Sequence, residues 1–83
     1  MDTKKQKTLT LKKYNSTLVG ERIKELRLEK GIGQNKLAAD LGLSNASISY
    51  WEQGKQEPSS SALFLLAQYF DISVDYILGL TDY

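Results

Sequence analysis

The residues best suited to chemistry are short, neutral polar side chains that gather in the middle of the chain. They are Ser44, Asn45, Ser47, Ser49, Tyr50 and Gln53. Hydroxyl and amide groups donate and accept hydrogen bonds, but none of them is a strong base at neutral pH. The chain has no Cys and no His, so it lacks a thiolate and the usual general base. This region is therefore suited to recognition by hydrogen bonding rather than to catalysis.

The carboxylates in the first half of the chain do not suggest a catalytic centre. Acidic residues interspersed among helically spaced apolar residues usually cover the solvated face of a helix. No spacing typical of a metal site or a cofactor site is present. We therefore expect a protein that is not an enzyme and that needs no metal and no cofactor. The carboxylates concerned are Glu21, Glu25, Glu29 and Asp40.

Charge is unevenly distributed along the 83 residues. Residues 1–17 hold five Lys and one Asp, a net charge of +4. Residues 18–55 hold six basic and five acidic residues, net +1, whereas residues 56–83 hold four acidic residues and no basic one, net −4. Because an acidic segment repels phosphate, a surface for a polyanion is expected in the first two segments.

No apolar run approaches the roughly 20 residues of a membrane-spanning helix. The lysine-rich residues 1–13 also lack the apolar stretch of a signal peptide. We therefore expect a cytoplasmic protein with no membrane partner.

Apolar residues at helical spacing predict five helices in an all-α fold. Small polar residues precede several of the helices and glycines follow most of them, as is usual for helix caps. The predicted boundaries are Val19 and Gly31 for the first helix, Gln34 and Gly42 for the second, Ser44 and Gly54 for the third, Ser59 for the start of the fourth, and Ser73 and Gly79 for the fifth.

The second and third predicted helices position the polar residues. Ala38 is small enough for two helices to cross closely, and Gly42 permits a tight reversal at positive φ between them. Ile48 and Trp51 are spaced to face inward from the third helix. The opposite face of this helix then points outward, and it consists of Asn45, Ala46, Ser49 and Tyr50.

Residues 19–80 resemble the helix-turn-helix domain of the phage Cro and repressor type, also called the xenobiotic-response-element type. Three stretches carry the resemblance, in the family's order: VGERIKELRLEKGIGQNKLAADLG, LSNASISYWEQGKQEPS and LFLLAQYFDISVDYILGL. It implies an all-α, five-helix lambda-repressor-like domain over residues 18–80, between a flexible basic arm (1–17) and a short tail (81–83). It also implies a transcriptional repressor that binds a pseudo-palindromic, double-stranded DNA operator as a homodimer, with the third helix in the major groove.

The resemblance assigns the base contacts to the third helix. Asn45, Ala46 and Tyr50 match the family's base-reading positions, and Ser49 lies beside them as a small donor. Asparagine can pair bidentately with adenine, and the alanine methyl group can contact the methyl group of thymine. Bidentate reading of guanine by Arg is missing, because neither Arg nor Lys occurs at these positions. The predicted operator half-sites therefore favour A·T pairs.

The resemblance assigns phosphate contacts to two places. Gln34 matches the glutamine that opens the second helix, where the helix N-terminus favours an anion. A second backbone-contacting turn is matched by Gln53, Gly54 and Lys55. The remaining candidates for phosphate contact are Asn35, Lys36, Ser44 and Ser47.

The resemblance also bears on three further positions. Arg27 and Glu52 match a pair that clamps the first helix to the end of the third, which is a structural role. Gly33 departs from the family, which favours a Ser or Thr cap at that position. We therefore expect a weaker start to the second helix.

The role of two segments stays open at this point. The basic arm is interpreted as a solvated tail, as an extension into a flanking minor groove, or as a strand at Thr8–Leu11 that pairs with a second chain. Four residues near the C-terminus form either a dimer surface or a partly buried face within the monomer. They are Leu65, Tyr69, Val74 and Tyr76.

A second class of function is also compatible with the sequence. An antitoxin, or another regulator that sequesters a protein, uses the same DNA-binding fold and a further surface for its partner. The acidic residues 56–83 are the candidate surface for such a protein partner or for an antirepressor.

Overall fold

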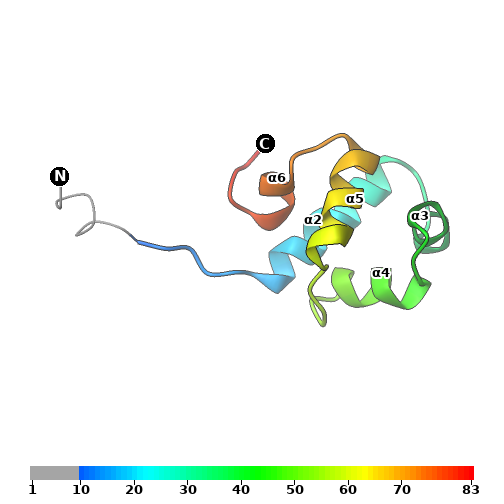
Figure 1. The fold of residues 1–83 in the computed structure, drawn as a ribbon, viewed down its shortest axis with the longest axis horizontal. Helices are drawn as coiled ribbons and strands as arrows, with labels where there is room; N and C mark the ends of the chain where they lie inside the picture. The colour runs from blue at the N-terminus through cyan, green and yellow to red at the C-terminus, as the bar shows by residue number, and fades with distance from the viewer. Residues whose placement is uncertain (1–9) are drawn as a thin grey trace.

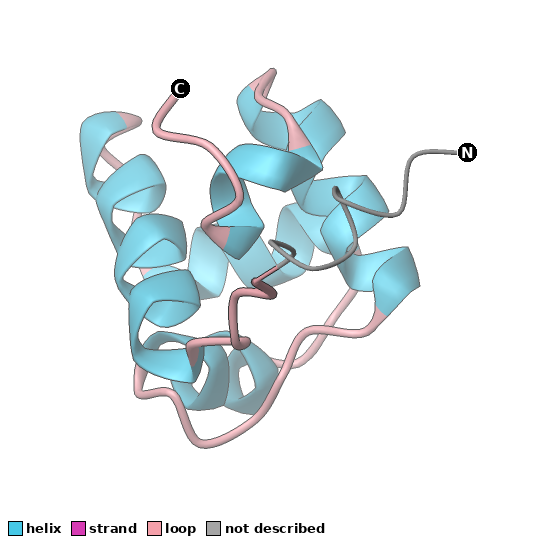
Figure 2. Ribbon diagram, turned by 90° about the vertical axis from the view of Figure 1, so that its left-hand side faces the viewer, coloured by secondary structure: helices cyan, strands magenta, loops and turns pink. Residues whose placement is uncertain are grey.

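The computed structural model describes residues 10–83, and in that range it consists of helices and loops without a strand (Figure 2). The helices are α2 (Ser16–Glu29), α3 (Gln34–Leu41), α4 (Asn45–Glu52), α5 (Ser60–Phe70) and α6 (Val74–Leu78). In Figure 1, α3 and α6 lie at opposite ends of the group, with α4 along its lower edge. Over residues 10–83 the predicted all-α fold with five helices is confirmed.

Helix α2 begins at Ser16, three residues before the predicted start at Val19. The side chain of Asn15 caps it, because its Oδ1 accepts a hydrogen bond from the backbone N–H of Leu18 at 3.0 Å. The apolar pattern of the helix starts later than its cap, so periodicity alone placed the start too late. The interpretation of the polar residues 15–17 as a helix start agrees with the structure. The helix ends as predicted at Gly31, which has φ +73° and allows the Ile32 N–H to bond back to the Arg27 carbonyl.

The starts of α4, α5 and α6 follow the predicted caps. Each cap is a serine whose Oγ accepts the backbone N–H three residues later. The pairs are Ser44 with Ser47, Ser59 with Ala62, and Ser73 with Tyr76. Helix α5 ends at Asp71, which has φ 55°; the sequence analysis did not predict this left-handed stop at a residue other than glycine.

The core draws on all of these helices. Burying a side chain of valine or leucine size stabilises the fold by about 1.5–3 kcal/mol. The core therefore fixes α3 and α4 against the remaining helices. Its buried members are Val19, Ile23, Leu37, Ala38, Ile48, Trp51, Ala62, Leu66 and Ile77, among which Ile48 and Trp51 face inward as predicted.

The end of the predicted arm leaves the helices as an extended segment (Figure 1). Thr8 and Leu9 of the predicted strand lie outside the described residues, as does the arm before them. Thr10 and Leu11 form no strand in the structure, and Leu11 is exposed. Lys12 Nζ donates a hydrogen bond of 3.3 Å to the carbonyl of Gly79, which connects this segment to the end of α6.

Candidate nucleic-acid interface

A tight turn joins α3 to α4 and sets their relative orientation. Gly42 ends α3 with φ 70°, and the N–H of Leu43 bonds back to the carbonyl of Ala38 at 2.9 Å. Ser44 then caps α4 through the Ser47 N–H at 3.1 Å. Ala38 is buried, as expected for a small residue between two crossing helices. The two helices therefore form the predicted helix-turn-helix.

The outward face of α4 is small, polar and uncharged. Asn45 and Ala46 are exposed, Tyr50 is 47% exposed, and Ser49 is half-buried beside them. Ile48 and Trp51 are buried on the opposite face. The structure therefore brings all four predicted base-reading residues onto one accessible surface.

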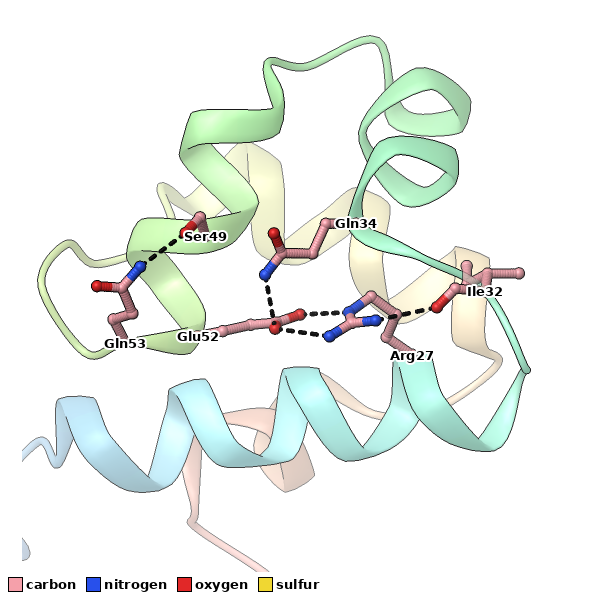
Figure 3. Close-up of polar contacts among 6 residues, drawn as sticks. All are labelled: Arg27, Ile32, Gln34, Ser49, Glu52 and Gln53. Atoms are coloured by element: carbon pink, nitrogen blue, oxygen red, sulfur yellow. Dashed lines mark hydrogen bonds and ion pairs between the residues drawn. The ribbon is translucent and has the colours of Figure 1, made fainter.

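The hydroxyl groups along α4 are held by bonds within the helix. Ser44 Oγ and Ser47 Oγ lie 3.0 Å apart and share a hydrogen. Gln53, at the end of α4, donates from Nε2 to Ser49 Oγ at 2.7 Å (Figure 3). The bond between Gln53 and Ser49 was not predicted, because two neutral polar residues four apart give no distinctive signal in a sequence.

The N-terminus of α3 has no side-chain cap, since Gly33 occupies the N-cap position in an extended conformation. The first backbone N–H groups of a helix lack partners within the helix and attract anions. Asn35 and Lys36 are exposed in this first turn, and Lys36 Nζ lies 3.2 Å from a carboxylate oxygen of Asp40. Because the α3 N-terminus lacks a side-chain cap, its first backbone N–H groups are free to donate hydrogen bonds.

A buried ion pair connects α2 to the end of α4 (Figure 3). Arg27 Nε lies 2.7 Å from Glu52 Oε2, and Arg27 Nη2 lies 3.0 Å from Glu52 Oε1. These side chains are only 10% and 4% exposed, respectively. The hydrogen bond to Glu52 raises the pKa of Arg27, so the guanidinium stays charged. The pair inferred from the resemblance is therefore present.

Gln34 belongs to the same cluster, which the sequence analysis did not foresee. Its Nε2 donates to Glu52 Oε1 at 3.1 Å, while Arg27 Nη1 donates to the Ile32 carbonyl at 3.0 Å (Figure 3). The start of α3 is therefore attached to both α2 and α4. An amide nitrogen carries two hydrogens, so Gln34 keeps one donor for another partner.

The turn after α4 is packed against the start of α2. Gly54 has φ +74°, and a β-carbon there would lie 3.5 Å from the backbone of Ser16. The N–H of Lys55 bonds to the carbonyl of Tyr50 at 2.9 Å. The predicted phosphate-contacting residues Gln53, Gly54 and Lys55 thus form a defined turn at the end of α4.

The model of the helix-turn-helix family of the Cro and repressor type matches residues 23–77, which include α3, α4 and the turn between them. The chain belongs to this family. The predicted family resemblance is confirmed, and with it the interpretation of α3 and α4 as the helix-turn-helix pair.

Relatives of this helix-turn-helix protein include named regulators. The repressor protein C2 of Salmonella phage P22 is 39% identical over 64 residues, which are 77% of this chain and 30% of that protein. The HTH-type transcriptional regulator YobD of Bacillus subtilis is 37% identical over 62 residues, 75% of this chain and 55% of that protein. The matched part of the chain therefore spans about half the length of these relatives or less.

Two solved structures resemble the helix-turn-helix protein along most of its length. The P22 c2 repressor, in complex with a synthetic operator, superposes with a TM-score of 0.71 at 39% identity and covers 74% of this chain and 92% of that chain. The restriction-modification controller protein C.AhdI of Aeromonas hydrophila gives a TM-score of 0.69 at 31% identity and covers 75% and 94%.

Two residues of the proposed dimer surface have contacts inside the helix-turn-helix monomer. Tyr69 donates from its hydroxyl to Asp40 Oδ2 at 2.6 Å, and the Tyr76 ring lies 4.2 Å from the guanidinium of Arg22. Val74 is half-buried and Leu65 is 36% exposed. The sequence analysis overlooked Phe64, which is 65% exposed on α5.

The described part of the helix-turn-helix domain has neither a metal-binding cluster nor a membrane-spanning helix. Residues 10–83 contain no group of three or more acidic residues that could hold a metal ion. None of the helices in this range is long and apolar enough to cross a membrane.

Proposed function

We propose that this chain is a sequence-specific DNA-binding repressor of transcription, which binds a pseudo-palindromic operator as a homodimer. In this proposal α4 lies in the major groove and α3 lies across the phosphate backbone. The observation that carries the proposal is the accessible, uncharged face of α4 beside the uncapped N-terminus of α3. This combination offers donors both to base edges and to a phosphate.

The position-by-position roles follow the geometry. Asn45, Ala46, Ser49 and Tyr50 are proposed to contact bases, since they share the accessible face of α4. The proposed phosphate contacts come from the α3 N-terminus and from the turn after α4, which flank that face. These residues are Gln34, Asn35, Lys36, Ser44, Ser47, Gln53, Gly54 and Lys55.

Dimerisation is part of the proposal because one copy offers little charge to the DNA. Residues 18–83 have a net charge of −3, since +1 for residues 18–55 adds to −4 for residues 56–83. Two linked copies on one duplex gain affinity through effective concentration without any new contact to the DNA. The likeness to the P22 c2 repressor, which was solved with an operator, supports this arrangement.

We further propose that the protein is cytoplasmic and has no catalytic activity. The chain lacks Cys and His. Within residues 10–83, the buried carboxylate of Glu52 is bound to Arg27 and Gln34. A carboxylate held in this way is engaged in structure, so it is not free to act as a general base.

A gel-shift titration tests the proposal. The probe is DNA from upstream of the chain's own gene, and the competitor is excess unrelated duplex. Saturable binding that survives the competitor supports the proposal. Binding that disappears with competitor and depends only on salt contradicts it.

Two variants locate the contact surface in the same assay. Asn45→Ala removes an exposed amide from the α4 face and is expected to weaken binding. Gln68→Ala removes an exposed amide from α5 and serves as the matched control, with binding like that of the wild type.

A further inference from the structure

Gln53 is bonded to a residue of the base-reading face, although the sequence points to a phosphate contact for it. Its Nε2 donates to Ser49 Oγ at 2.7 Å, one helical turn earlier (Figure 3). Gln53 is the C-cap of α4 with φ −86° and ψ −5°, so its backbone is held by the helix end. The Ser49 hydroxyl is therefore fixed in place from the C-terminal side.

This bond decides what the serine can offer to a ligand. A hydroxyl group has one hydrogen and two lone pairs. The side-chain N–H of Gln53 occupies one lone pair of Ser49 Oγ. No group within residues 10–83 accepts the hydroxyl hydrogen of Ser49. Ser44 and Ser47 differ, because one of their two hydroxyls donates its hydrogen to the other at 3.0 Å. The hydrogen of Ser49 is thus free for an acceptor outside the protein.

We propose that Gln53 is a positioning residue that sets Ser49 as a hydrogen-bond donor to an acceptor on one base edge of the operator. The acceptors in the major groove are N7 and O6 of guanine, N7 of adenine and O4 of thymine. A base pair that presents such an acceptor to the Ser49 hydroxyl hydrogen is then favoured over a pair that presents none. This inference rests on the proposed function, and it gives Gln53 a role in sequence selectivity.

Four variants test the coupling between the two residues. Ser49→Ala removes the hydroxyl, and Gln53→Met removes the N–H while it keeps the length of the side chain and adds no charge. The double variant combines them. Gln56→Met is the matched control, because Gln56 is an exposed glutamine three residues further along. Thermal unfolding is measured for each variant to confirm that it folds.

The experiment first selects duplexes from a random library with the wild-type protein. The selected duplex and its single-base-pair substitutions are then titrated with every variant by fluorescence anisotropy. The wild type is expected to discriminate at one pair in each half-site by roughly 2- to 12-fold, the range for one hydrogen bond. Ser49→Ala, Gln53→Met and the double variant should lose this discrimination equally, whereas Gln56→Met should keep it.

Two results would overturn the inference while leaving the proposed function intact. In one, Gln53→Met discriminates as well as the wild type. In the other, it weakens binding to all duplexes alike and leaves their ranking unchanged, which indicates a phosphate contact of Gln53 without any positioning of Ser49. A wild-type protein that binds every duplex equally contradicts the proposed function itself, and the inference with it.

The direction of the hydrogen bond has its own test. In Gln53→Glu the carboxylate accepts the hydroxyl hydrogen, so Ser49 presents only lone pairs. The preferred base at the coupled pair should then change towards one with an amino group, whereas Gln56→Glu adds the same charge and keeps the original preference. An unchanged preference in Gln53→Glu overturns the donor assignment.

Discussion

Gly20 of α2 lies directly against the backbone carbonyl of Trp51 in α4. A β-carbon at residue 20 would overlap that carbonyl oxygen, and it would lie only 2.8 Å from the carbonyl oxygen of Glu52. A β-carbon, which cannot donate a hydrogen bond, essentially never approaches a backbone oxygen so closely. The helix with the proposed base-reading face is therefore packed backbone to backbone against α2.

Gly20→Ala should lower the free energy of unfolding by about 1–3 kcal/mol, the usual cost of overpacking. In an exposed helix the same change would stabilise by about 1 kcal/mol, because alanine is the better helix former. Urea denaturation measures the effect, with the exposed Lys24→Ala in the same helix as the control. A Gly20→Ala protein as stable as the wild type would contradict the close packing.

The two helix crossings show what a sequence can predict. The close crossing at Ala38 was predicted because Gly42, which permits the chain reversal, follows only four residues later, so the signal is local. Gly20 lies 31 residues before Trp51, and nothing near it in the chain indicates which backbone it will meet. The serine caps were found for the same local reason, and the left-handed Asp71 was missed because aspartate seldom ends a helix in this way.

Glu52→Ala should cost about 3–5 kcal/mol of stability, since it leaves the buried guanidinium of Arg27 without its partner. The double variant Arg27→Met with Glu52→Met removes both charges, and it should be more stable than Glu52→Ala. Chemical denaturation of the three proteins makes the comparison. If Glu52→Ala unfolds at the wild-type denaturant concentration, the pair has no structural role.

Tyr69→Phe should raise the pKa of Asp40. The hydrogen bond from Tyr69 is the main cause that holds this pKa below its ordinary value, and Lys36 lowers it further. A carboxyl group whose pKa is lower in the folded state than in the unfolded state stabilises the fold at pH values above its unfolded-state pKa. This contribution is lost as the pH falls through the folded-state pKa. The destabilisation by Tyr69→Phe should therefore shrink in acid.

An NMR titration of the Asp40 carboxyl carbon measures this shift. Tyr76→Phe is the control, because the Tyr76 ring contacts Arg22 rather than Asp40. An Asp40 pKa that is the same in Tyr69→Phe and in the wild type would show that the bond does not form in solution.

Gly33→Asn should raise stability by a few tenths of a kcal/mol, roughly 0.3, because it supplies the missing cap of α3. Gly33 has an extended conformation with φ −86° and ψ 171°, and a β-carbon there would meet nothing within 4 Å. Gly33→Asp makes the same cap and adds a negative charge beside the proposed phosphate. It should therefore bind operator DNA more weakly than Gly33→Asn, and equal affinities would place the phosphate elsewhere.

The candidate site was predictable only where a residue's role follows from its place on one helix. The outward face of α4 could be read from the inward spacing of Ile48 and Trp51. The bonds of Gln34 to Glu52 and of Tyr69 to Asp40 span 18 and 29 residues, so they depend on the folded arrangement. The same limit applies to Phe64, whose exposure depends on which other helices cover α5.

Selection of binding sites from a random duplex library is the decisive test of sequence-specific binding through α4. We expect an enriched pseudo-palindrome whose half-sites are about 10 base pairs apart and carry A·T at the contacted pairs, with enrichment lost in Asn45→Ala. G-rich half-sites would contradict the base assignments on α4. A selected pool that matches the input library would contradict sequence-specific DNA binding altogether.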